Sequence, residues 1–132
     1  MELSAIEGMR LLFSCFTAIL FLQSGLDKIA NWKGEKSFYT DHFSKSFLGS
    51  LVPLLMPIIT CTELAAGILS AVGVIMLLLG GNHTWGCWGM LLSCIALLML
   101  FFGQRIAKDY AGAATLVPYF LCSAVGLYFY MI

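Results

Sequence analysis

The sequence is poor in charge. Only 11% of its 132 residues are Asp, Glu, Lys or Arg, and seven basic and seven acidic residues give a formal net charge of zero. The basic residues are interleaved with acidic ones rather than gathered in one tract. A nucleic-acid surface needs a basic stripe, and electrostatic attachment to anionic lipid needs a basic cluster. The composition therefore excludes nucleic acid as a partner.

Histidines and paired cysteine motifs are also scarce. The two histidines, His42 and His83, lie in polar stretches, where they cannot supply both axial ligands of a haem within a membrane bundle. A dinuclear carboxylate centre needs several acids and histidines on facing helices, and only Glu63 interrupts the apolar sequence. The five cysteines include no Cys-x-x-Cys pair, which a disulfide-exchange catalyst would carry. We expect neither a metal site nor a covalently bound cofactor.

What the sequence has in abundance is apolar residues. They make up 61% of the chain, and the mean hydropathy is +0.94. Uncharged runs cover residues 11–26, 46–62, 64–104 and 110–132, and the turn-forming group Gly80, Gly81, Asn82 and His83 divides the third. Because about 20 apolar residues cross a bilayer, we predict four membrane-spanning helices in one domain, 1–132. Their expected bounds are about 7–28, 54–79, 86–106 and 112–131, and the fold class is all-α.

The basic residues predict a topology. Six of the seven fall in the first and third connections, which lie on the same side of a four-span chain. Cytoplasmic loops of membrane proteins carry an excess of Lys and Arg. We therefore expect these two connections in the cytoplasm and both termini outside. The six residues are Lys28, Lys33, Lys36, Lys45, Arg105 and Lys108.

The first connection has an aromatic pattern of its own. Tyr39, Phe43, Phe47 and Leu51 recur every four residues, which predicts a short amphipathic helix at the membrane interface. The functional alternative is a lid over the entrance to a ligand site.

Small residues recur at helical spacing within the predicted spans. Helices in lipid associate where small side chains allow their backbones to approach. We expect Gly25, Gly67, Gly89 and Gly126 at such helix contacts. On the last helix, the expected inward face consists of Gly112, Thr115, Tyr119, Cys122 and Gly126.

Glu63 is the acidic residue that the topology does not explain. An unpaired carboxylate within the membrane is costly to ionise, so it must be neutral, paired or wetted by a cavity. One interpretation is a proton or ligand site. The other is an ion pair that fixes helix packing, with Lys28 reaching from the same membrane side or Arg10 from the opposite side.

Other polar residues gather at the cytoplasmic side of the predicted bundle. Together with Glu63 they indicate a polar pocket that the aromatic connection would close. Arg105 and Asp109 are four residues apart, so they have the alternative of pairing with each other. The further members of this candidate site are Gln23, Asp27 and Gln104, besides Lys28 on the same side and Arg10 reaching from the opposite side.

Several of these positions form a recognisable order. Arg10 opens the first helix, FLQSGLDK follows at residues 21–28, and ELAAG stands at residues 63–67, before Leu69 and Gly73. This order resembles the DoxX family of small four-helix membrane proteins. The resemblance implies a subunit of the bacterial inner (plasma) membrane that accompanies redox complexes, including quinol oxidase and thiosulfate:quinone oxidoreductase assemblies. It implies no agreed catalytic residue. The family-pattern positions are Arg10, Gly25, Lys28, Glu63 and Gly67.

Two functions of different class follow. The first is a DoxX-like accessory subunit, bound to a protein partner or to copies of itself in the lipid bilayer and holding a quinone or lipid near Glu63. Any enzymatic role would then be that of a quinone-linked oxidoreductase subunit. The alternative is a small proton-coupled transporter that uses Glu63. Four-span exporters of that kind place their acid in the first helix and have short connections, which favours the first function.

Overall fold

The computed structural model describes residues 3–132, so the first two positions of the predicted domain lie outside it. The described residues form helices joined by short connections and include no strand. Its elements, in order, are α1 (Ala5–Ala30), α2 (Trp32–His42), the 3-10 turn η1 (Gly49–Leu51), α3 (Val52–Leu78), α4 (Thr84–Ile106) and α5 (Tyr110–Met131).

The four long helices α1, α3, α4 and α5 are long and apolar enough to cross a membrane, which confirms the predicted four-helix membrane architecture. Each begins two residues before its predicted start. Capping accounts for part of this difference. The Ser4 side chain accepts a hydrogen bond from the Glu7 amide at the start of α1, and the Asp109 side chain accepts one from the Gly112 amide at the start of α5.

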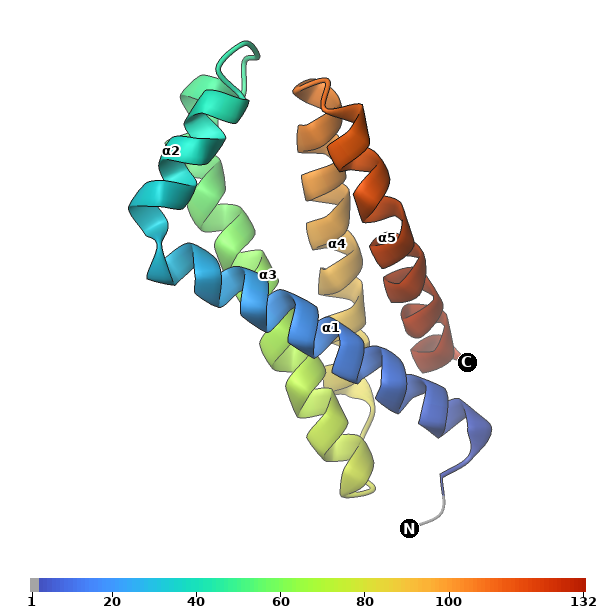
Figure 1. The fold of residues 1–132 in the computed structure, drawn as a ribbon. Coiled ribbons are helices and arrows are strands. Elements are labelled where there is room, and N and C mark those ends of the chain that lie inside the picture. The colour runs from blue at the N-terminus through green and yellow to red at the C-terminus, as the bar shows by residue number, and fades with distance from the viewer. Residues whose placement is uncertain (1–2) are drawn as a thin grey trace.

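The helices alternate in direction, as Figure 1 shows. The α1–α3 and α4–α5 connections lie at one end of the bundle, and the α3–α4 turn lies at the other end, near the start of α1 and the end of α5. α1 crosses α3 obliquely, and α4 packs between α3 and α5. The two connections that carry most of the basic residues therefore share one end, as the four-span prediction requires.

The first connection differs from its prediction. Its helix, α2, ends at His42, so the expected helical stripe from Tyr39 to Leu51 is broken. After the end of α2, the Ser44 hydroxyl donates a hydrogen bond to the Asp41 carbonyl at 2.8 Å, and the Ser46 hydroxyl donates one to the Phe43 carbonyl at 3.0 Å. Such local bonds compete with helix continuation. α2 also packs against the first turns of α3, so it is part of the bundle.

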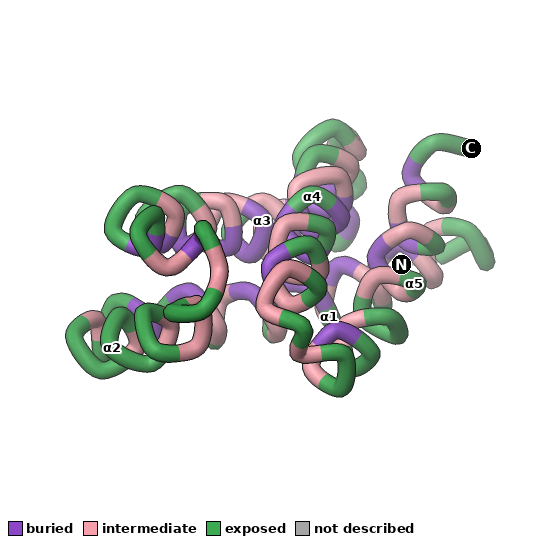
Figure 2. The backbone as a smooth tube through the Cα atoms, turned by 90° about the horizontal axis from the view of Figure 1, so that it is seen from above, coloured by how far each residue is buried: buried purple, intermediate pink, exposed green. Residues whose placement is uncertain are grey.

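Glycines set the distance between neighbouring helices. A Cβ at Gly67 would lie 2.8 Å from the backbone nitrogen of Leu22, and one at Gly89 would lie 2.7 Å from that of Ser70. At Gly25 the neighbour is the Leu64 side chain, and at Gly126 it is Met90 together with Phe13. All four glycines predicted at helix contacts thus lie where helices approach closely. Figure 2 shows the buried stretches of α1, α3 and α4 gathered where these helices meet.

The inward face of α5 was predicted correctly at Gly126 but incorrectly at Thr115 and Tyr119. Thr115 and Tyr119 are exposed, whereas Ala113, Ser123, Gly126 and Tyr130 are buried. The Tyr130 hydroxyl lies 2.5 Å from Ser14 Oγ on α1. This contact fits a buried stripe through Ser123, Gly126 and Tyr130 rather than one through Thr115 and Tyr119.

Candidate functional site

Glu63 and Lys28 form an ion pair in the interface between α1 and α3. The Lys28 ammonium lies 3.1 Å from Oε1 of Glu63 and donates to Oε2 at 3.3 Å. Glu63 is 0% exposed and Lys28 only 5%. The close approaches at Gly25 and Gly67 bring the two helices near enough for the side chains to meet. Of the two partners considered for Glu63, the structure therefore selects Lys28.

The ion pair has one further polar partner. Lys28 Nζ also donates to Ser24 Oγ, one turn earlier on α1, at 3.0 Å. Glu63 Oε1 accepts no well-directed hydrogen bond from the described residues, although the ammonium is close by. The carboxylate thus depends on Lys28 alone for its compensation. Without that partner it would be an uncompensated buried charge.

Arg10 lies at the opposite end of the bundle, away from Glu63. Its Nε donates to the carbonyl of Phe129 at 2.7 Å, and its guanidinium carbon lies 5.7 Å from the centre of the Tyr130 ring. The last carbonyls of a helix lack partners within the helix and carry partial negative charge. Arg10 therefore caps α5 and does not belong to the Glu63 site.

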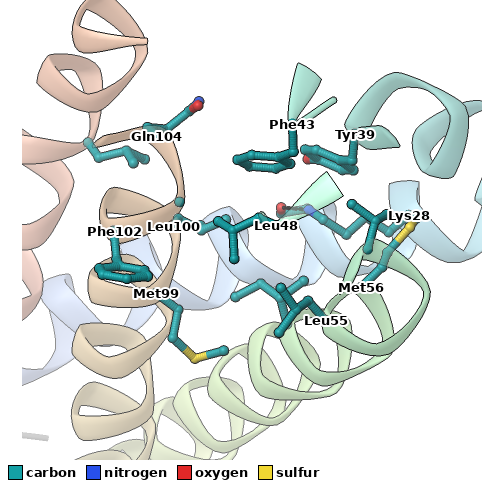
Figure 3. Close-up of a pocket in the computed structure, with 15 residues that line it drawn as sticks. Lys28, Tyr39, Phe43, Leu48, Leu55, Met56, Met99, Leu100, Phe102 and Gln104 are labelled. Carbon is teal, nitrogen blue, oxygen red and sulfur yellow. Dashed lines mark hydrogen bonds between the residues drawn. The ribbon is translucent and has the colours of Figure 1, made fainter. Parts of the chain in front are cut away.

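A cavity of about 400 Å³ lies beside the ion pair. Figure 3 shows Met99, Leu100 and Phe102 of α4 on one wall, Leu55 and Met56 of α3 on another, and the adjacent rings of Tyr39 and Phe43 across the top. The polar residues of the lining are Ser24, Lys28, Tyr39 and Gln104. The remaining lining residues are Leu48, Val52, Ile59, Gly103 and Leu116.

The predicted polar pocket is thus a mainly apolar cavity with fewer polar members than expected. Gln23 and Asp27 are exposed on the outer side of α1 and do not line it. Arg105 is exposed too, with its guanidinium carbon 4.5 Å from the centre of the Tyr110 ring. Asp109 caps α5. Only Lys28 and Gln104 of the predicted group line the cavity.

The considered pairing of Arg105 with Asp109 is also absent among the described residues. Two side chains four residues apart meet only if the helix continues through both. α4 ends at Ile106, and Lys108 adopts a positive φ of 60°. The turn therefore separates Arg105 from Asp109.

His42 is a site residue that the sequence did not reveal. Its Nε2 lies 2.7 Å from Gln104 Oε1 and 3.6 Å from Asp109 Oδ2, and its ring stacks on Phe38. His42 thus joins the first connection to the α4–α5 turn. The nearby Tyr39, Phe43 and Leu48 line the cavity, with Tyr39 and Phe43 across its top.

Tyr39 supplies a neutral hydroxyl at the edge of the cavity. Burial raises the pKa of Tyr39, an effect that the positive charge of Lys28 opposes. The Lys28 ammonium lies 5.9 Å from the centre of the Tyr39 ring. The phenol therefore remains protonated at neutral pH and can donate a hydrogen bond.

Comparisons with known proteins and a search for metal-binding groups identified no further feature of this site. Within residues 3–132 no three His, Cys, Asp or Glu side chains are grouped to hold a metal ion. No protein-family model, no curated protein and no solved structure matches the chain.

Proposed function

We propose that the chain is a DoxX-like, non-catalytic membrane subunit that holds an amphiphile of the quinone or lipid class beside the Lys28–Glu63 pair. The observation that carries this proposal is the cavity of about 400 Å³ between α1, α3 and α4. Ligand sites are mostly apolar hollows of about 300 to 1,000 Å³ with a few convergent polar groups. Apolar walls suit a hydrocarbon chain, and Lys28, Tyr39 and Gln104 suit a polar head.

The burial of the Glu63 carboxylate favours a role in binding a ligand over a role in catalysis. A general base must come within hydrogen-bond reach of its substrate. Glu63 is fully buried, is paired with Lys28 and is not part of the cavity lining. We therefore propose that the subunit belongs to a redox complex of the bacterial inner membrane and that its protein partner carries out the redox reaction. The existence of this partner is proposed from the resemblance to the DoxX family.

Two tryptophan variants on neighbouring positions test the cavity. Leu55 lines the cavity, whereas Leu54 is 61% exposed on the outside of the same helix. The protein should retain a stoichiometric small molecule when extracted in mild detergent, detectable by native mass spectrometry. Leu55→Trp should abolish this retention, and Leu54→Trp should leave it unchanged. Equal retention by both variants, or none by the unaltered protein, would contradict the proposed function.

The accessory role has a separate test, which also addresses transport. A subunit should co-purify with a partner protein in a fixed ratio. The alternative, a small proton-coupled transporter, requires Glu63 to take up and release protons during transport. The transporter would be the correct function if vesicles show a substrate-driven proton flux that is lost in Glu63→Gln and if no partner protein co-purifies. Those two results together would contradict the subunit proposal.

A further inference from the structure

We infer that the cavity selects a neutral amphiphile whose head accepts hydrogen bonds through carbonyl-type oxygens, and that it discriminates against anionic lipids and fatty-acid carboxylates. This inference rests on the proposed function, because it specifies the ligand that the same cavity takes. It follows from two properties of the polar lining, namely its total charge and its excess of donors.

The total charge at the polar end of the cavity is zero. Lys28 is the only residue of formal charge among the 15 that line the cavity. Its ammonium lies 3.1 and 3.3 Å from the two oxygens of Glu63, and both side chains are buried. The net charge of the Lys28–Glu63 pair is zero whichever of the two side chains holds the shared proton. A ligand head therefore meets a compensated site and not a free cation.

An anionic head would gain little from this site. It would lose its hydration on entering a hollow with apolar walls, and that loss is large for an ion. The attraction of Lys28 would be offset by the repulsion of Glu63, whose carboxylate lies 3.1 Å from the ammonium and outside the lining. A neutral head pays a much smaller desolvation cost. The charge balance therefore favours neutral ligands.

The polar groups around the cavity are mainly donors. Lys28 has three ammonium protons, of which two are directed to Glu63 Oε2 and Ser24 Oγ, and Tyr39 carries a hydroxyl proton. Gln104 accepts from His42 through Oε1, so the donor that it retains is its amide NH₂, which lies beside Gly112 of α5. Ser24 Oγ already accepts from Lys28. A complementary head must supply acceptors, as quinone carbonyls and the ester carbonyls of acylglycerols do.

Methyl oleate and oleate test the selection, because they share one hydrocarbon chain and differ in the charge of the head. Their binding to the detergent-solubilised full chain at pH 8 is measured with radiolabelled ligands. We expect methyl oleate to bind about tenfold more tightly, the ratio that corresponds to about 1.4 kcal/mol. Equal binding, or tighter binding of oleate, overturns the inference while leaving the proposed function standing. If neither binds, both fail.

Charge variants show whether the Lys28–Glu63 pair sets this preference. Glu63→Gln leaves Lys28 uncompensated and should shift the ratio of affinities about tenfold or more toward oleate. Lys28→Gln combined with Glu63→Gln restores neutrality and should restore the preference for methyl oleate, which also guards against misfolding of the single variant. Asp27→Asn removes an exposed carboxylate outside the cavity and should change nothing. A ratio that stays constant across all variants overturns the inference.

Native mass spectrometry of the protein purified from its own membrane distinguishes the two natural ligand classes, isoprenoid quinones and acylglycerols. A bound mass that matches an isoprenoid quinone or an acylglycerol supports the inference and identifies the source. A bound anionic phospholipid or fatty acid contradicts it.

Discussion

Nε2 of His42 lies 2.7 Å from Oε1 of Gln104, and this bond joins the end of α2 to the last turn of α4, between residues 62 positions apart. Gln104 lines the cavity, and the residues next to His42 cover it. The bond therefore holds the covering segment, residues 39–48, against the end of α4.

Replacing His42 with phenylalanine should loosen this cover. Phenylalanine retains ring contact with Phe38 and Phe43 but loses the hydrogen bond to Gln104. Because such a bond contributes about 1 kcal/mol, we expect the segment to open roughly fivefold more often. Hydrogen exchange of residues 43–51 measures the opening. Thr40→Val, at an exposed position of α2, is the control, and equal exchange in all three proteins would show that His42 does not hold the cover.

Removing one member of the Lys28–Glu63 pair should destabilise the protein strongly. Glu63→Leu leaves Lys28 as a buried, uncompensated cation and should lower the free energy of unfolding by about 3 to 5 kcal/mol. Adding Lys28→Met should recover most of the loss, because the apolar pair leaves no buried charge. Unfolding in mixed detergent micelles measures both variants. Additive effects of the two substitutions would mean that the side chains do not interact.

Enlarging Gly67 should separate α1 from α3. A Cβ there would lie 2.8 Å from the Leu22 backbone nitrogen, which cannot move aside as a flexible side chain could. We expect Gly67→Ala to destabilise the protein by about 1 to 3 kcal/mol. Gly8→Ala is the matched control, because no atom lies within 4 Å of its added Cβ and alanine favours the helix. Thermal unfolding in detergent should separate the two, and similar melting temperatures would contradict the close packing.

The pH dependence of Tyr39 follows from its burial, which raises its pKa above the ordinary value of 10. The neutral phenol is favoured in the folded state, so its contribution to stability is complete below pH 10 and falls as the pH rises above it. Ultraviolet titration of tyrosinate, as the difference between the protein and Tyr39→Phe, should give a midpoint above 10. A midpoint at or below 10 would show that Tyr39 is solvated.

Labelling of single cysteines in a cysteine-free background tests the side of the membrane on which each connection lies. Ser37 on α2 and Asn82 in the α3–α4 turn are both exposed and occupy opposite ends of the bundle. The positive-inside bias predicts that Asn82→Cys reacts with an impermeant reagent from outside and Ser37→Cys only from the cytoplasm. The reverse pattern would invert the topology.

The sequence by itself determined the four membrane helices and their approximate ends, because a span needs a fixed length of apolar residues and its backbone must bond internally. It also identified Glu63 as an exception and the glycines as contact points. It left the partner of Glu63 open, since Lys28 and Arg10 were both within reach by depth.

Only the tertiary structure decided that choice, because the angle at which α1 crosses α3 places Lys28 beside Glu63 and Arg10 at the end of α5. The same holds for the inward face of α5, which includes Tyr130 in contact with Ser14 of α1, and for His42, whose partner is distant in the chain. Hydropathy and spacing are local properties, whereas these contacts depend on how each helix is rotated about its axis, and that rotation is set by neighbouring helices.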